Sequence, residues 1–251
     1  MPTQPLFGYH FRRAVAPFVI LFIERDGSTY LTSLLESRPD IRVVYERLAV
    51  MRQKGQGARE QLEWAGRFLT PPPMGRAAAI GFKTKLVDVL DPQGFAGLLQ
   101  ARRCRILQMR RRNHVKAVVS RINARRLYER SGHWNLYRDQ DRLPALEIDP
   151  AEFGRFLFER EESERELGEY VGRLALPTLE IVYEDLLQAR RTTLAQVFEF
   201  LGVPIADAEG KTLKHTPDDL RQVILNFDEL RASYAGTRYA PMFDEHIPAS
   251  R

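Results

Sequence analysis

Cysteine and histidine are scarce in this sequence of 251 residues, and each scarcity excludes a class of site. The single cysteine, Cys104, rules out an internal disulfide and lies in an apolar stretch, which predicts a buried, unreactive thiol. The five histidines are scattered, and no two of them have the i, i+3 or i+4 spacing of ligands that share a helix face. We therefore expect no metal centre. The histidines are His10, His114, His133, His215 and His246.

Long hydrophobic runs are also missing. The first apolar run, residues 16–23, is interrupted by Pro17 and ends at Glu24. It is far shorter than the ~20 residues that a membrane-spanning helix needs. Arg12 and Arg13 are not followed by an apolar stretch and a cleavage site in the order typical of a signal peptide. We expect no stable membrane insertion and a cytoplasmic location.

The composition is that of a globular α/β protein. Hydrophobic residues make up 44% of the chain and aromatic residues 10%, which is enough for a packed core. The length fits one large domain better than two small ones. We predict a single domain over residues 1–251, with a core at about 16–204 and a C-terminal helical extension over 205–251.

The net charge of +5 is unevenly distributed. Residues 101–130 contain eleven basic side chains and one acidic side chain, whereas residues 147–169 contain nine acidic and three basic ones. Such runs are often solvated helix faces, and clustered Lys and Arg residues also bind nucleic-acid phosphates. The sequence contains no nucleic-acid-binding motif, so we expect no nucleic-acid partner and a local site for a small polyanion.

Hydrophobic periodicity predicts strands that alternate with helices. Strands are expected at 17–23, 43–44, 77–82, 104–109 and 178–183. Helices are expected at 28–37, 58–69, 93–102, 114–130, 152–174, 185–201 and from Pro217 to Tyr234, with a loop at 131–148. This order indicates an α/β fold with a mostly parallel sheet and helices on both faces. Ligands of such sheets bind at the carboxyl ends of the strands, which directs attention to residues 24–28 and 110–114.

The first of these loops has the features of an anion cradle. Gly27 allows a close turn, Ser28 and Thr29 add hydroxyl donors at a helix start, and Arg25 adds a cation. An N-capping Ser beside a turn Gly is the alternative interpretation. An NTPase P-loop requires a Gly five residues before its second Gly and a Lys directly after it, but Phe22 and Ser28 occupy these positions. The ordinary NTPase or kinase interpretation is therefore disfavoured.

The second loop offers a site for a terminal phosphate. Arg112 lies at a predicted strand end and Ser120 follows eight residues later on the next helix. A guanidinium group forks onto a phosphate, and a hydroxyl can donate beside it. This spacing resembles the 3′-phosphate site of the sulfotransferases, and the first loop resembles their 5′-phosphosulfate loop.

The resemblance covers about three-quarters of the chain. Residues 18–50 and 104–134, the segment IVYEDLLQARRTTLAQVFEFLGVP and the C-terminal DLRQVILNFDELRASYAGTRYAPMF are similar to bacterial carbohydrate sulfotransferases of the nodulation-factor type and, more distantly, the trehalose type. The resemblance implies a P-loop-like three-layer α/β sandwich. It also implies metal-free transfer of a sulfuryl group from 3′-phosphoadenosine 5′-phosphosulfate to a hydroxyl of a carbohydrate, glycolipid or small metabolite.

The resemblance also assigns cofactor-binding roles. Arg25, Gly27, Ser28 and Thr29 would hold the 5′-phosphosulfate, and Asp26 belongs to the same loop. Arg112 and Ser120 would hold the 3′-phosphate. Tyr30 and Tyr183 match aromatic residues near the nucleotide, with core packing as the alternative. Asp26 departs from the family pattern, which has Ser or Thr there. Because a carboxylate repels a polyanion, we expect Asp26 to point away and cap the turn or to pair with a basic side chain.

Three residues are predicted to act in catalysis. An acceptor hydroxyl needs a base, and Glu46 follows the second strand where the carbohydrate subfamily has its catalytic Glu. Lys83 resembles a Lys common in the family, and with Arg25 it would neutralise charge on the leaving phosphate oxygen. The alternatives are a surface Glu and a surface Lys beside strand ends.

The acceptor site is the least defined part of the sequence. Trp134 lies in a region that often lines the acceptor site of this subfamily, and packing is its alternative role. No residue of the 131–148 loop identifies the acceptor, and no pattern indicates an oligomeric state. Two other functions stay open: a non-catalytic anion- or nucleotide-binding protein on the same fold, and a small-molecule kinase.

Overall fold

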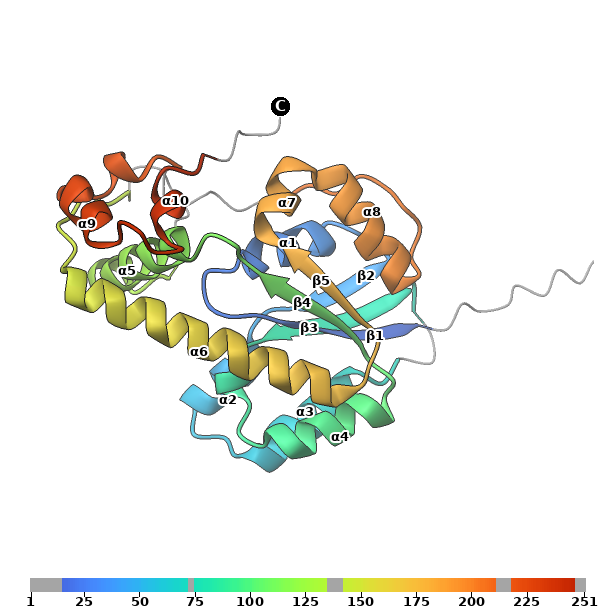
Figure 1. Ribbon diagram of the computed structural model, residues 1–251. Coiled ribbons are helices and arrows are strands. Elements are labelled where there is room, and N and C mark those ends of the chain that lie inside the picture. Colours follow the sequence, from blue (N-terminus) through green and yellow to red (C-terminus); the bar gives the residue numbers. More distant parts are fainter. Residues whose placement is uncertain (1–14, 72–74, 135–141, 211–217, 247–251) are drawn as a thin grey trace, which may run out of the picture.

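A computed structural model of the protein describes residues 15–71, 75–134, 142–210 and 218–246. Five strands in these ranges form one parallel sheet in the order β2-β3-β1-β4-β5 (Figure 1). This arrangement confirms the predicted α/β class with a parallel sheet. The strands are β1 (Ala16–Leu21), β2 (Ile41–Val44), β3 (Ala79–Thr84), β4 (Arg105–Arg110) and β5 (Thr178–Val182).

Strand β1 lies at the centre of the sheet, between β3 and β4. Its side chains alternate between two cores: Phe18 and Ile20 enter one cluster, and Val19 and Leu21 enter the other. Burial on both faces explains why the strand is a continuous apolar run in the sequence. From β1 the chain winds to β2 on one side, and β4 and β5 follow on the other side. This reversal of winding places a ligand site beside the carboxyl end of β1.

Helices cover both faces of the sheet (Figure 1). One apolar core joins the sheet to α1, α7 and α8, and the other joins it to α2, α3, α4 and the C-terminal half of α6. The expected helix over 185–201 is two helices that meet at Ala189. The short α2 and the 3₁₀ turn η1 (Leu86–Asp88) were not predicted. The helices are α1 (Ser28–Glu36), α2 (Arg47–Gln53), α3 (Ala58–Phe68), α4 (Pro92–Ala101), α6 (Pro150–Leu174), α7 (Tyr183–Gln188) and α8 (Arg190–Leu201).

A third helical group lies beyond the carboxyl ends of the strands, at the left of Figure 1. It has its own apolar core, to which α5 (His114–Ser131) contributes Val115 and Val119 and the first half of α6 contributes Phe153 and Phe156. The C-terminal elements complete this core. They are η3 (Leu220–Gln222), α9 (Phe227–Ser233) and α10 (Ala240–Phe243).

The predicted last helix, Pro217 to Tyr234, is wrong as a continuous element. Pro217 itself lies outside the described residues. From Leu220 the chain forms only η3, and then Ile224 makes a parallel bridge with Leu146. The N–H of Leu225 donates to the Leu146 carbonyl at 2.8 Å, so the backbone leaves the helical path before α9 begins. The apolar spacing read as one helix is instead the buried side of two short pieces.

The described helices include none that is both long and apolar enough to cross a lipid bilayer. Among the described residues, no three or more His, Cys, Asp or Glu side chains cluster in a way that could hold a metal ion. The predicted division into a core and a C-terminal extension stays a prediction.

Candidate active site

The loop between β1 and α1, residues 22–27, turns sharply at Gly27. Gly27 has φ 83° and ψ 13°, in the left-handed region. A Cβ atom placed on this residue would lie 2.1 Å from Cδ2 of Tyr183, so any side chain would collide with the ring. Arg25 is also left-handed, with φ 70°. The sequence needs glycine at 27 for both its conformation and the close approach of Tyr183.

This turn leaves a row of backbone donors without acceptors. In the described part of the chain, the N–H groups of Gly27, Ser28 and Thr29 donate no hydrogen bond, while the carbonyl of Gly27 accepts from Tyr30 and Leu31. The start of α1 therefore presents several N–H groups and the positive end of its dipole at one place. This arrangement can hold a phosphate or sulfate group.

Lys83 brings the predicted catalytic residues to this cradle. Its ammonium group donates to Thr29 Oγ1 at 2.8 Å and to Ser28 Oγ at 3.3 Å. It also lies 3.1 Å from Oε1 of Glu46. Lys83 belongs to β3, whereas the predicted strand ended one residue before it. Its side chain is 1% exposed, so it is not a surface lysine beside a strand end.

Burial and neighbouring groups act on the pKa of Lys83 in opposite directions. Burial lowers the pKa of the Lys83 ammonium group, and the carboxylate of Glu46 acts in the opposite direction. The ammonium also lies 5.0 Å from the ring centroid of Phe22, a favourable cation–π contact. Glu46 precedes the first turn of α2, and its side chain is 34% exposed. A carboxylate that is open on one side and paired with a buried cation can accept a proton from a bound molecule.

Arg25 lies in the same loop, two residues before Gly27, and contacts α5. Its Nε donates to Ser120 Oγ at 2.9 Å, and Nη1 donates to the Trp134 carbonyl at 3.4 Å. Desolvation by the surrounding protein, followed by the nearby Arg111, lowers the pKa of Arg25 to about 10. Ser120 thus contacts the cation of the first loop. It makes no hydrogen bond with Arg112 in the described structure, although the sequence pairs these two residues.

Arg112 points toward solvent and pairs with an acid. Its Nη2 lies 2.6 Å from Oδ1 of Asp185, and the two side chains are 55% and 46% exposed. The backbone N–H groups of Arg112 and Asn113 donate to buried Glu184, at 3.0 and 3.2 Å. Because Glu184 already uses these donors at the start of α5, a phosphate here would depend on side chains such as Arg112.

Arg111 is a site residue that the sequence did not single out. It is buried and donates to the Arg25 carbonyl at 3.1 Å, and its guanidinium carbon lies 5.0 Å from the Tyr183 ring centroid. Its Nε has no acceptor in the described structure. Burial lowers its pKa. The alternation of β4 gave a usable signal, because buried Met109 and exposed Arg110 place the next side chain inward.

The Asp26 side chain is turned away from the cradle and combines the two arrangements that were expected for it. Its carboxylate is fully buried, accepts from the N–H of Ile23 at 2.9 Å and pairs closely with Arg160 of α6. Burial raises the pKa of Asp26 to about 6, although the Arg160 guanidinium favours the carboxylate. Both anticipated roles, capping the turn and pairing with a basic side chain, are fulfilled by this one residue.

The two predicted adenine-contacting tyrosines lie in different surroundings. Tyr183 is buried between Gly27 and Arg111, directly behind the β1–α1 loop. Tyr30 packs against the first apolar core, and a Cβ on Gly210 would lie 2.7 Å from its Cε2. Tyr183 is therefore part of the support of the loop, and Tyr30 is partly covered by the chain near Gly210.

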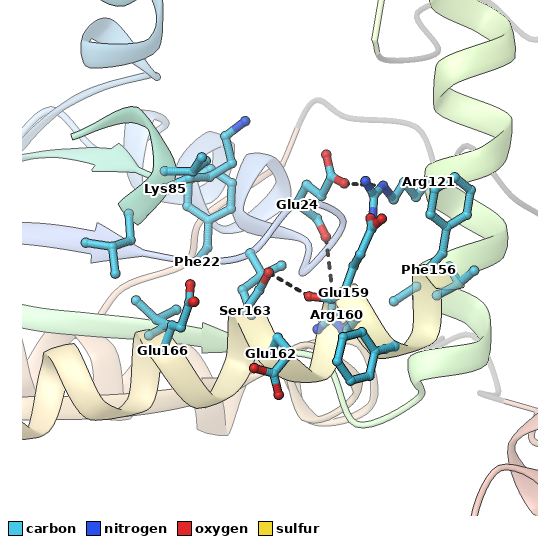
Figure 2. A pocket seen from close by; sticks show the side chains of 17 residues that line it. Phe22, Glu24, Lys85, Arg121, Phe156, Glu159, Arg160, Glu162, Ser163 and Glu166 are labelled. Atoms are coloured by element: carbon cyan, nitrogen blue, oxygen red, sulfur yellow. Dashed lines mark hydrogen bonds and ion pairs between the residues drawn. The ribbon is translucent and has the colours of Figure 1, made fainter. Parts of the chain in front are cut away.

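A cavity of about 600 Å³ opens beside the cradle, between the end of β1, η1, α5 and α6. Its apolar side includes Phe22, whose ring also contacts Lys83, and Phe156. Figure 2 shows Arg121 directed at Glu24 and lying over Phe156. Arg121 pairs with Glu24 at 2.6 Å and with Glu159 at 2.8 Å.

Trp134 does not line this cavity. Its ring stacks on Tyr128 with centroids 4.3 Å apart and is half exposed. Residues 135–141 of the predicted acceptor loop lie outside the described residues, whereas residues 142–148 are described and include the bridge from Leu146 to Ile224.

Comparisons with known proteins support one relationship. No protein-family model matches the chain. The chain is 26% identical over 238 residues to Nodulation protein H of Rhizobium tropici, covering 91% of this chain and 93% of that protein. In structure it is similar to a sulfotransferase from Alicyclobacillus acidocaldarius, with a TM-score of 0.50, 18% identity, and coverage of 91% of this chain and 93% of the other. The predicted resemblance to sulfotransferases of the nodulation type is confirmed.

Proposed function

We propose that this chain, which has the sulfotransferase fold and is similar to a nodulation protein, is an enzyme. It would move a sulfuryl group from 3′-phosphoadenosine 5′-phosphosulfate to an acceptor hydroxyl. One observation carries the proposal. The buried ammonium of Lys83 contacts Glu46, Ser28 and Thr29 together, at 3.1, 3.3 and 2.8 Å. A base, a cation and an anion cradle therefore meet at one point beside a cavity.

The donor would lie along the carboxyl edge of the sheet. The free N–H groups of residues 27–29, the hydroxyls of Ser28 and Thr29, and Arg25 would hold its 5′-phosphosulfate. Arg112 and Ser120 would hold its 3′-phosphate, with Tyr30 and Tyr183 near the adenine. Asp26 would take part through the shape of the loop, because its carboxylate is already occupied by Ile23 and Arg160.

The transfer needs a base on one side of sulfur and positive charge on the other. Glu46 takes the proton of the acceptor hydroxyl as its oxygen forms a bond to sulfur. The bond between sulfur and the phosphate oxygen breaks, and adenosine 3′,5′-bisphosphate leaves. Lys83 and Arg25 stabilise the negative charge that grows on that oxygen.

The acceptor would enter through the cavity, and we propose a carbohydrate hydroxyl. The cavity combines aromatic faces, Phe22 and Phe156, with the ion-paired group of Glu24, Arg121 and Glu159. Aromatic rings contact the apolar faces of sugars, and charged groups hydrogen-bond strongly to hydroxyls. The cytoplasmic location stays a prediction.

The two alternative functions lose support. A non-catalytic binding protein was favoured by a carboxylate in the anion loop, but the Asp26 side chain faces Arg160. A small-molecule kinase with an NTPase P-loop needs a Lys directly after the second Gly, but this chain has Ser28 there.

Replacing Glu46 by Gln tests the proposal. The substitution keeps the shape of the side chain and removes the base, so we expect turnover to fall by about 10²–10⁴-fold with donor affinity retained. The assay follows donor consumption with a panel of mono- and oligosaccharide acceptors, and affinity is measured with adenosine 3′,5′-bisphosphate. Glu63→Gln, on the exposed face of α3, is the matched control and should keep full activity. Unchanged turnover in Glu46→Gln would reject Glu46 as the base.

A further inference from the structure

The loop that forms the cradle is held from outside by α6. Arg160 lies on α6, 134 residues beyond Asp26 in the sequence, and is 5% exposed. One of its terminal nitrogens, Nη1, donates to the carbonyl of Glu24 at 3.2 Å. The other, Nη2, pairs with Asp26 and with Glu164, the latter at 3.1 Å. One guanidinium therefore binds both a backbone oxygen and a side chain of the β1–α1 loop.

A second buried arginine completes this support. Arg111 donates to the Arg25 carbonyl at 3.1 Å from the end of β4. The carbonyl groups of Glu24 and Arg25 are thus both occupied by guanidinium groups. Backbone oxygens held in this way cannot face a bound anion, whereas the N–H groups of Gly27, Ser28 and Thr29 stay free of acceptors within the described residues. The loop is set in the orientation that anion binding requires.

We propose that Asp26 and Arg160 form a positioning pair that fixes the β1–α1 loop for the donor, an inference that rests on the proposed function. Asp26 acts in two ways. Its carboxylate ties the turn by accepting from Ile23, and its negative charge is directed toward α6. Without Arg160, only the Ile23 N–H would hold the carboxylate, which could then turn toward the cradle and repel the phosphosulfate. Arg160 thus allows the loop to carry Asp where the family pattern has a hydroxyl residue.

The pair also links the two halves of the site. Arg160 and Glu24 both line the cavity that we assign to the acceptor (Figure 2). The residue that orients the donor loop is therefore part of the acceptor wall. A displacement of α6 would move both at once.

The affinity of folded variants for two nucleotides tests the pair. Adenosine 3′,5′-bisphosphate has a 5′-phosphate that contacts the loop, and adenosine 3′-monophosphate does not. We expect Arg160→Met to lose at least about tenfold in affinity for the bisphosphate and to keep its affinity for the monophosphate. We expect Asp26→Ser/Arg160→Met to recover most of the loss, because the carboxylate that repels the anion is gone. A residue needed only for folding would give neither the selective loss nor the recovery.

The controls separate the possible failures. Arg165→Met removes an exposed arginine of the same helix, which pairs only with Glu162 and Glu169 in the described structure, and should change neither affinity. If Arg160→Met does not fold by circular dichroism, Arg160→Lys takes its place, with a smaller loss expected for the bisphosphate alone. An unchanged ratio of the two affinities in either folded variant would overturn the positioning pair. If the wild-type protein binds the two nucleotides equally, the proposed function fails first.

Discussion

The charged groups of the β1–α1 loop and Arg112 of the β4–α5 loop, which would face the proposed donor, are held in different ways. Around the β1–α1 loop, the side chains of Asp26, Lys83 and Arg160 are 0%, 1% and 5% exposed, and each has charged or hydroxyl partners. In the β4–α5 loop, residues 111–113, Arg111 and Asn113 are buried, but the Arg112 side chain is 55% exposed and pairs with Asp185, which is 46% exposed. The first loop is fixed before any ligand arrives, whereas Arg112 can exchange its partner.

On the proposed function, this difference matches the chemistry that each loop would do. Sulfuryl transfer needs donors already aimed at the reacting group, because preorganised charge is what lowers the barrier. Buried ion pairs with several partners supply such rigidity, and breaking one costs several kcal/mol. An exposed pair is worth about 0–1 kcal/mol, so a phosphate can displace Asp185 from Arg112 at little cost. On the proposed function, Arg112 would therefore contribute affinity, and the β1–α1 loop would contribute the rate.

Of the variants that compare the two loops, Lys83→Met has the largest expected effect, which is on the rate. Removing the buried ammonium takes away the cation beside the breaking bond, and we expect turnover at saturating donor to fall by about 10²–10³-fold. Lys54→Met, at the exposed end of α2, is the control and should keep wild-type turnover. A Lys83→Met enzyme with nearly full turnover would show that the first loop is not the catalytic one.

Arg112→Ala should change affinity with little effect on stability. We expect binding of adenosine 3′,5′-bisphosphate to weaken by about 10–100-fold, because hydrogen bonds to charged groups contribute ~1.5–3 kcal/mol. Binding of AMP, which lacks the 3′-phosphate, should not change, and the free energy of unfolding should shift by less than ~1 kcal/mol. Asp185→Asn sharpens the test, since it releases Arg112 and should tighten bisphosphate binding severalfold. Equal losses for the bisphosphate and AMP in Arg112→Ala would contradict the assignment.

Two glycines with similar backbone angles measure how tightly the first loop is packed. Gly27 and Gly55 have φ 83° and 72°, so Ala strains the backbone at both. A Cβ at 27 meets Tyr183 at 2.1 Å, whereas a Cβ at 55 has nothing within 4 Å. We expect Gly27→Ala to lower the free energy of unfolding by about 1–3 kcal/mol more than Gly55→Ala, measured in urea. Equal losses in the free energy of unfolding would mean that the Tyr183 ring moves aside at little cost and does not support the loop.

The sequence predicted the features that depend on local pattern. Alternation and apolar runs located the five strands of the described sheet. The signal was clear for β1, because burial on both faces leaves an unbroken hydrophobic segment. Short motifs directed attention to Gly27, Ser28 and Thr29, and the structure brings Glu46 and Lys83 to the same place. Asp26 was recognised as a departure, and its expected turn away from the anion agrees with its burial against Arg160.

The missing parts depend on contacts between distant segments. Arg160 and Asp26 are 134 residues apart in the sequence. No local spacing distinguishes Arg160 from the other charged residues of α6. Glu184 caps the start of α5 from 71 residues away in the sequence. The C-terminal segment was read as one helix because its apolar spacing is helical, but the bridge between Leu146 and Ile224 interrupts it. Tertiary packing overrode the local signal in the C-terminal segment, and the two long-range contacts had no local signal.

Calorimetric titration of adenosine 3′,5′-bisphosphate into the protein, with AMP and magnesium-ATP in parallel, tests the central claim most directly. A sulfotransferase site predicts micromolar binding of the bisphosphate and much weaker binding of the other two, because only the bisphosphate satisfies both loops. Equal binding of the three nucleotides, or tighter binding of magnesium-ATP, would contradict the donor site and with it the proposed reaction.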